Sequence, residues 1–466
     1  MKFFEALGNV FRIPDLRKRV LFTLAMLAVY RLGGHIPTPG INVDKWQAFL
    51  ASSSGGIFGF FDLFAGGNIR RFTIFALGIM PYITASIILQ LLTVVVPTLE
   101  KLQKEGELGR RKITQWTRYL TIALSIIQSF GIAQGLWHSN GGFVNNPGWG
   151  FVLMTIISLT TGTAFIMWLG EQISDRGIGN GMSLIIFTGI VANMPAAISN
   201  IYRNTFVTRE WNPLQMIVIL LMMVGVVAFV VLVERGERRI PVQYAKRVIG
   251  RRVMGGQSTH MPLKVNAGGV IPVIFASSIL AFPQTLAAMP FVKNMPWLSN
   301  TLGSIRHGEP LYYVLFVAGI IFFCFFYVSI IFNPNEAADN MRKYGGFIPG
   351  IRPGRNTAEY MNAILTKITV VGGIYLAILC LIPDIMISGI KLQHLPWFLG
   401  TFMDAHAPRI LLEGLNVNFY FGGTSLLIVV GVAMDTVNQV EAQLIMRHYE
   451  GFTPRAGRIR GRRSTF

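Results

Sequence analysis

The chain has 466 residues, of which 52% are hydrophobic and only 14% charged, and its net charge is +19. This composition places it among integral membrane proteins rather than soluble ones, so the distribution of the positive charge matters more than its sum. The two cysteines, Cys324 and Cys380, lie inside apolar runs, which indicates small core residues rather than a disulfide or a metal pair.

Ten apolar runs follow one another, and each is expected to cross a bilayer as a helix. No small-x-small cleavage site follows the first run, so residues 1–19 are not interpreted as a cleavable signal. The predicted fold is an all-α polytopic membrane protein with ten transmembrane helices. The runs lie at residues 20–36, 72–96, 119–137, 151–170, 183–202, 214–233, 268–290, 311–332, 368–390 and 417–437.

Lys and Arg alternate sharply between successive loops. Eight lie in residues 234–267, six in 97–118 and six after residue 446. Because cytoplasmic loops carry the excess of positive charge, this pattern predicts that both termini and the even-numbered loops are cytoplasmic.

The external loop before the second run contains a peculiar apolar and glycine-rich segment at residues 57–68, which is too short to span a membrane. One interpretation is an interfacial re-entrant segment. The other is a mobile segment that folds into the helix bundle, because irregular backbone at membrane depth must be buried or line a cavity.

The second run, residues 72–96, is 25 residues long without a charge, yet polar residues and Pro81 interrupt it. Pro81 is expected to kink the helix. Ile79 and Ile83 lie one turn apart and point the same way. The run therefore faces other protein or a pore.

Two basic cytoplasmic loops follow later in the chain. Residues 234–267 alternate apolar and polar side chains near residues 240–245, which predicts a protruding hairpin. Residues 333–366 contain a rigid, glycine-punctuated stretch at 346–354. Both loops are interpreted as docking arms for an acidic or RNA-containing partner, the alternative being charge that sets topology and contacts anionic lipid.

An internal repeat relates the second and seventh runs. GIMPYITAS at 78–86 aligns with GVIPVIFAS at 269–277 on Gly, Pro, Ile, Ala and Ser. Five runs separate the two copies, and an odd number forces opposite orientations, which predicts two inverted halves with a functional site near mid-membrane.

Motifs for nucleotide hydrolysis or metal chemistry are missing from the sequence, since it contains no G-x-x-x-x-G-K-[ST], H-E-x-x-H, C-x-x-C or G-x-S-x-G. The acidic residues nearest the runs, Glu171, Asp384 and Asp435, lie close to their ends, which disfavours an ion-coupled transporter. No catalytic residue, cofactor or metal is expected. Isoleucines beside helix-bending residues could instead form an apolar constriction that excludes ions and water by dewetting.

The chain resembles the SecY/Sec61-alpha family, whose bacterial members form the central channel subunit of the Sec protein translocase. The resemblance covers nearly the whole length. It is most specific at FALGIMPYI (75–83), KEGELGRRKI (104–113), GIGNG (177–181), AKR (245–247), QSTHMPLKVN (257–266), GIRPG (350–354) and FYFGGTS (419–425).

The resemblance implies four functional regions. The pore ring falls on Ile79, Ile83, Ile186, Ile190, Ile274 and Ile428, all isoleucine as in the family's pattern. A re-entrant plug helix at about 57–71 includes Phe58, Phe60, Phe61, Leu63, Phe64, Gly66, Gly67, Asn68 and Arg71. Lateral-gate positions are Gln90, Thr93, Ser277 and Ser278. Ribosome or motor contacts fall on Arg239, Lys246, Arg247, Arg251, Arg252 and Arg352.

It also implies an organisation and partners. The N-terminal half is expected at 1–202, an external hinge at 203–213, the C-terminal half at 214–446 and a basic cytoplasmic tail at 447–466. Expected partners are the small SecE and SecG subunits, the SecA ATPase, the ribosome through its rRNA, preprotein signal sequences, SecDF, YidC and anionic lipids. The expected location is the bacterial cytoplasmic membrane.

The implied activity is a passive channel that translocates unfolded preproteins and releases transmembrane helices laterally, driven by a partner. The alternatives are a secondary transporter of a small solute and a membrane scaffold without transport. Two regions depart from the family's pattern: the long external segment 391–416, with Trp397 and His406, and the strongly basic tail 455–463.

Overall fold

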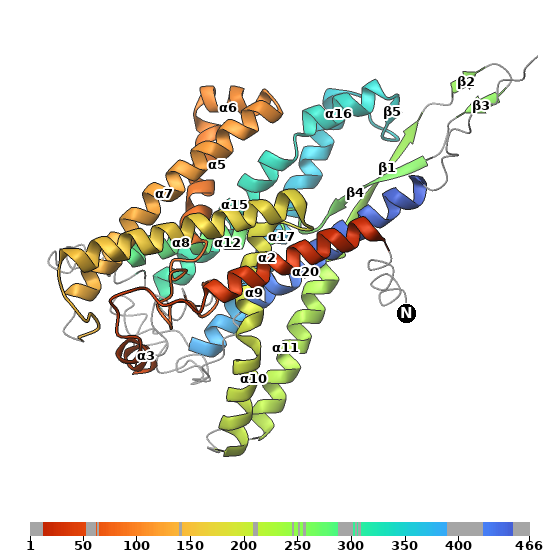
Figure 1. The fold of residues 1–466 in the computed structure, drawn as a ribbon. Coiled ribbons are helices and arrows are strands. Elements are labelled where there is room, and N and C mark those ends of the chain that lie inside the picture. Colours follow the sequence, from red (N-terminus) through yellow and green to blue (C-terminus); the bar gives the residue numbers. More distant parts are fainter. Residues whose placement is uncertain are drawn as a thin grey trace, which may run out of the picture.

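The structure is a computed structural model that describes residues 13–52, 62, 65–138, 142–207, 213–244, 247–249, 252–254, 258–287, 302, 305, 309–388 and 423–450. Helices dominate it (Figure 1). A helix lies on each of the ten predicted apolar runs. In chain order these are α2 (Pro14–Gly33), α5 (Met80–Val95), α7 (Glu107–Trp137), α8 (Trp149–Arg176), α9 (Gly181–Ala192) with α10 (Met194–Tyr202), α11 (Pro213–Glu234), α12 (Ile271–Ala287), α15 (Pro310–Ile331), α17 (Arg355–Ser388) and α20 (Gly423–Glu450).

Shorter elements connect these helices: α3 (Val43–Ser52), α6 (Pro97–Lys104), a π-helical turn η1 (Arg203–Val207) and α16 (Pro334–Lys343). Within the described part of the chain, six helices are each long and apolar enough to cross a membrane. α5 and α6 count as a seventh if taken together, although they meet at an angle of 100°.

The start of α5 differs from the sequence prediction. The apolar run begins at Phe72, but residues 72–79 form successive turns and the helix begins only at Met80. Pro81 lies in the first helical turn, where its missing N–H would have no intrahelical partner in any case. It therefore starts this helix, and the predicted kink is wrong.

The predicted protruding hairpin is confirmed. β1 (Glu237–Tyr244) pairs antiparallel with β4 (Ser258–Lys264), with Ile240 opposite Met261. At the tip, β2 (Arg247–Ile249) pairs with β3 (Arg252–Met254) and projects from the bundle (Figure 1). A third strand, β5 (Gly346–Phe347), pairs with the end of β1 and joins the two basic loops in one sheet.

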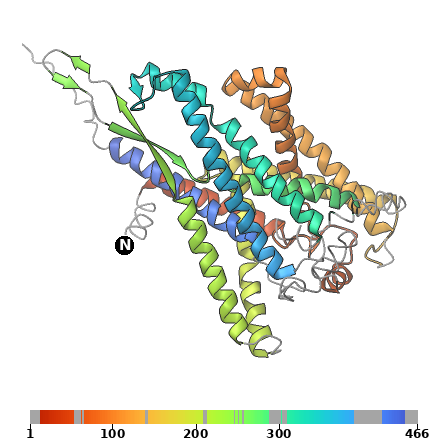
Figure 2. The ribbon, with the colours of Figure 1, turned by 180° about the vertical axis from the view of Figure 1, so that it is seen from behind.

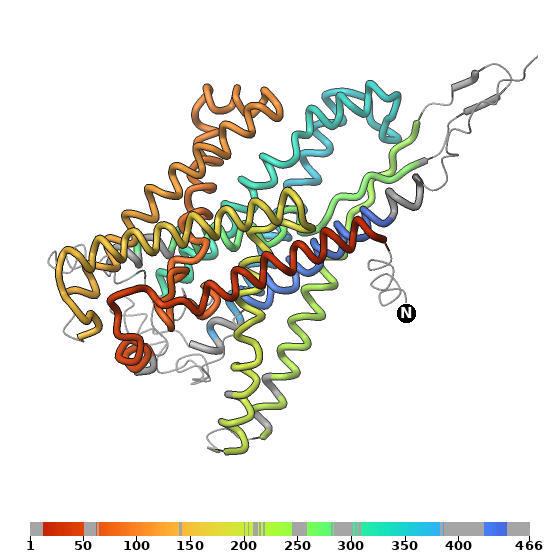
Figure 3. The backbone as a smooth tube through the Cα atoms, viewed as in Figure 1, coloured from red at the N-terminus to blue at the C-terminus, as the bar shows by residue number. Residues whose placement is uncertain are grey.

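The start of α2 lies beside the C-terminal part of α20, at the end of the bundle that carries the hairpin (Figure 3). Leu16 and Ile178 pack there against Val440 and Leu444. At another edge, α10 and α11 form a long helical hairpin that extends away from the other helices (Figure 2). The main hydrophobic core unites residues of α2, α5, α8, α9, α11, α12, α15, α17 and α20.

Candidate pore and gate

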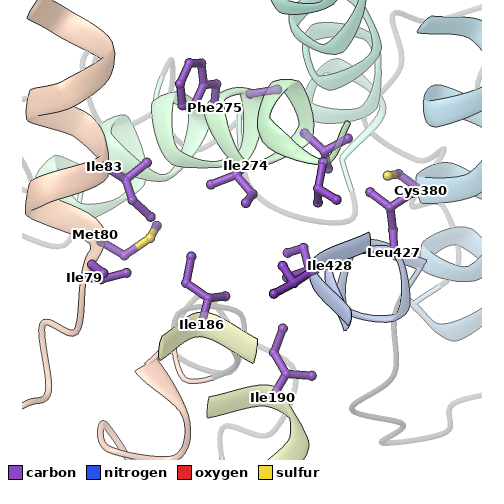
Figure 4. Packing of buried hydrophobic residues seen from close by; sticks show 14 of the residues in the cluster. Ile79, Met80, Ile83, Ile186, Ile190, Ile274, Phe275, Cys380, Leu427 and Ile428 are labelled. Carbon is purple, nitrogen blue, oxygen red and sulfur yellow. The ribbon is translucent and has the colours of Figure 1, made fainter. Parts of the chain in front are cut away.

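Five of the six isoleucines proposed for the pore ring lie on α5, α9, α12 and α20, Ile79 lies in the turn just before α5, and all six belong to one buried cluster. They point toward a common centre in Figure 4, with Met80 beside Ile79 and Ile83. Each is at most 6% exposed. A constriction lined in this way by hydrocarbon offers an ion or water no hydrogen-bonding partner, so it can act as a seal by dewetting.

The repeat positions two of these helices by the same backbone geometry. Gly78 and Gly269 have φ values of +58° and +61°, a left-handed conformation that only glycine adopts easily. Each helix begins two residues later with proline as its second residue. The N–H of Ile83 donates to the carbonyl of Ile79 at 3.1 Å, and the N–H of Ile274 donates to Val270 at 3.3 Å.

Sequence reasoning missed a second copy of the repeat. GMSLIIFTGI at 181–190 in α9 aligns with GTSLLIVVGV at 423–432 in α20, which makes Ile186 equivalent to Ile428. By the two alignments, the counterparts of Ile79 and Ile190 are Val270 and Val432. Both valines are buried in the same core cluster. Val270 already lies in the first alignment, and a second alignment of α9 with α20 would have found Val432.

The described part of the predicted plug packs into the bundle, while the mobility that the second interpretation gives residues 57–68 stays a prediction. We call residues 65–71 the plug stem. Gly66 and Gly67 have φ values of +71° and +84°. A Cβ at Gly66 would lie 2.6 Å from the Cα of Gly189 in α9, between Ile186 and Ile190. The stem therefore packs against the turn of α9 that carries Ile186 and Ile190.

Asp62 closes the stem into a compact turn. Its carboxylate accepts hydrogen bonds from the N–H groups of Ile69 and Arg70 at 3.0 and 3.2 Å, and the Arg70 side chain pairs with it at 3.0 Å. Burial raises the pKa of the Asp62 carboxyl, against the opposing effect of Arg70. Asn68 is also buried, whereas Arg71 is exposed. Phe58, Phe60, Phe61, Leu63 and Phe64, and with them the predicted plug helix, lie outside the described residues.

The four lateral-gate candidates lie on α5 and α12, which contact each other. The hydroxyl of Thr93 donates to the carbonyl of Gln90 at 2.7 Å, and those of Ser277 and Ser278 both donate to Ile274, at 2.9 and 2.7 Å. Because these hydroxyls are satisfied within their own helices, they can be buried at the seam without bonding across it.

The basic docking candidates lie mainly on the hairpin. Arg239 is exposed on β1 and pairs with Glu237. Arg247 and Arg252 belong to the tip strands, while Lys246 and Arg251 lie outside the described residues. Arg352 is exposed in the turn that precedes α17, and its carbonyl accepts a hydrogen bond from Thr357.

The structure thus shows a bundle of apolar helices with a buried isoleucine cluster and a glycine-rich stem packed into the bundle. Comparison with known proteins identifies the family. The SecY family model matches residues 73–437, so the chain belongs to the SecY family.

Relatives and solved structures agree with this assignment. The chain is 49% identical over 450 residues to the protein translocase subunit SecY of Escherichia coli K12, covering 95% of each chain. It is 48% identical to that of Streptomyces galbus, covering 96% of this chain and 99% of that one. Its fold matches a solved protein-conducting channel with a TM-score of 0.59 at 17% identity, over 94% of this chain and 95% of the other. It also matches Sec61 in a canine ribosome-channel complex, with a TM-score of 0.54 at 16% identity. This match covers 94% of this chain and 95% of the other.

The family assignment decides between the function classes left open by the sequence. The chain is a protein translocase subunit, a protein-conducting channel rather than an enzyme, and a multi-pass protein of the bacterial inner membrane. A secondary transporter is not favoured.

Proposed function

We propose that this chain forms a pore gated by three parts: the six-isoleucine ring, the plug and a lateral gate. Unfolded preproteins pass through the ring, and transmembrane helices leave sideways between α5 and α7 on one side and α12 and α15 on the other. The observation that carries this proposal is the convergence of all six isoleucines in one buried cluster, with the plug stem packed against Gly189 on the turn of α9 that carries two of them.

Two halves, residues 1–202 and 214–446, separate about the hinge at 203–213 when the gate opens. Both termini and the tail at 447–466 are cytoplasmic. The repeats between α5 and α12 and between α9 and α20 support this division, since each pairs one helix from either half.

Energy comes from a partner, because the sequence has no phosphate-binding loop. The SecA motor or the ribosome docks on the hairpin, at Arg239, Lys246, Arg247, Arg251 and Arg252, and near Arg352. SecE and SecG bind the outside of the bundle, signal sequences enter the lateral gate, and anionic lipids contact the basic loops. SecDF and YidC act on the same channel. A solved relative in a ribosome-channel complex and the projecting basic hairpin support the docking assignment.

The ring is tested with Ile83→Asn and Ile428→Asn in cells that depend on this channel. An amide at the constriction gives water a partner, so we expect the export of a reporter with a defective signal sequence to rise about tenfold, together with the resting ion leak. Ile127→Asn is the matched control, since Ile127 is 50% exposed on α7. If both ring variants match this control in export and leak, the ring assignment is wrong.

A further inference from the structure

Two adjacent side chains at the end of α2 reach the plug stem. The guanidinium of Arg31 donates to the carbonyl of Gly66 at 2.9 Å. The hydroxyl of Tyr30 donates to the carbonyl of Ala65 at 3.3 Å and accepts a hydrogen bond from the amide of Asn68 at 3.4 Å. Consecutive carbonyls of the stem are thus held by consecutive residues of the first membrane helix.

The turn of the stem is held by Asp62. Its internal hydrogen bonds go to Asp62: the N–H of Gly67 donates to the Asp62 carbonyl, and those of Ile69 and Arg70 donate to its carboxylate. The left-handed φ values of Gly66 and Gly67 keep the turn in this shape. The stem is therefore a preformed unit, and the carbonyls of Ala65 and Gly66 face α2.

The contact of the stem with α9 has a different character. Gly66 lies against Gly189 of α9 without any side chain on either residue, so this contact supplies van der Waals packing but no directed bond. Tyr30 is itself fixed by burial and by stacking on Phe75 at 5.9 Å between ring centroids. The indole N–H of Trp46 on α3 also donates to the carbonyl of Ile69 at 2.8 Å. The directed hold on the stem thus comes from α2 at Ala65 and Gly66, where its base is rigid, and from α3 at Ile69.

We propose that Tyr30 and Arg31 form a latch that holds the plug stem in the closed channel. This inference rests on the proposed function, since it assumes that the plug seals the pore. Moving the stem away breaks both hydrogen bonds to these carbonyls, one of them charge-assisted, and separates Asn68 from Tyr30. Arg31 is only half-buried, so its released guanidinium can turn to water and the latch can close again.

The latch is tested in the full-length channel, purified with its copurifying membrane subunits and placed in vesicles. Arg31→Met removes the donor while keeping the chain length, and Tyr30→Phe removes only the hydroxyl. Lys45→Met is the matched control, because Lys45 is an exposed cation that follows α2 by 12 residues and lies on the same loop as the stem. Two readouts are compared: iodide influx, and thiol labelling of Ala65→Cys in a background with Cys324→Ala and Cys380→Ala.

We expect Arg31→Met to raise both the influx and the labelling rate about tenfold, Tyr30→Phe about threefold, and Arg31→Lys to recover part of the wild-type value. Labelling of Ala197→Cys, a buried position on α10 outside the stem, should stay unchanged.

Either of two results overturns the latch. One is that Arg31→Met and Tyr30→Phe both behave like Lys45→Met while Ile83→Asn still raises the influx. The other is that labelling rises equally at positions 65 and 197, which would indicate general loosening of the bundle. If Ile83→Asn and Ile428→Asn also leave influx and export unchanged, it is the proposed function that fails.

Discussion

The starts of α5 and α12 share one backbone design but are anchored differently. Both begin two residues after a left-handed glycine, with a proline second and a pore-ring isoleucine fourth. Three residues before that glycine the copies diverge, since Phe75 stands in one and Asn266 in the other. The turn that orients the isoleucine is common to both copies. The residue that anchors this turn, Phe75 or Asn266, differs between them.

The two anchors use different physics. Phe75 is buried and stacks between Tyr30 and Phe165, at 5.9 and 6.0 Å between ring centroids, next to the plug stem. Asn266 is also buried, but its amide donates to the carboxylate of Glu234 at 2.6 Å and to the carbonyl of Gly269 at 3.1 Å. This ties the end of α11 to the start of α12 below the hairpin. Aromatic packing thus anchors the start of α5, which follows the plug stem. The hydrogen bonds of Asn266, which we call the polar clamp, anchor the start of α12, which follows the hairpin.

The largest effect is expected from a substitution that removes the aromatic anchor at Phe75. Phe75→Ala leaves a cavity beneath Tyr30, and we expect it to lower the stability of the channel by about 3–5 kcal/mol. The measurement is denaturant unfolding of the detergent-solubilised channel, followed by tryptophan fluorescence. Phe165→Ala is the partial control. Because Phe165 is 38% exposed, we expect its removal to lower the stability by less than Phe75→Ala does. Equal losses from the two variants would show that the buried stack is not the anchor.

A smaller effect is expected at the polar clamp. Asn266→Ala leaves the Glu234 carboxylate without its closest partner, and we expect a loss of about 1–3 kcal/mol in the same assay. The double variant Asn266→Ala with Glu234→Gln should lose less than the two single losses combined, since both remove one interaction. Strict additivity would mean that the 2.6 Å contact contributes no coupling.

Hydropathy alone predicted much of this architecture, because each apolar run must be buried in lipid or protein as a helix. It failed where distant backbone segments pair. The N–H of Ile74 donates to the carbonyl of Ile36 at 3.0 Å, and that of Thr38 donates to Phe72 at 2.9 Å, which holds residues 72–79 outside α5. The pairing of β5 with β1 and the contact of Arg31 with Gly66 were missed for the same reason. Periodicity within one segment cannot reveal a partner more than 30 residues away.

The smallest expected effect tests whether partner docking at the hairpin before α12 is separate from sealing by the plug stem before α5. Charge reversal by Arg251→Glu and Arg252→Glu changes only the hairpin tip before α12, so we expect motor or ribosome binding to vesicles to weaken about fivefold at physiological salt. The resting iodide influx should not change, because the hairpin tip projects away from the helix bundle (Figure 1). Arg31→Met should do the opposite and raise influx while leaving docking affinity intact.

Lys367→Glu, outside both docking loops, controls for the loss of positive charge as such. If the tip variant binds its partners like this control, the tip arginines serve only to set topology. If it also raises the influx, the two copies are not separable, and the common turn at Gly78 and Gly269 would have to transmit docking directly to the seal.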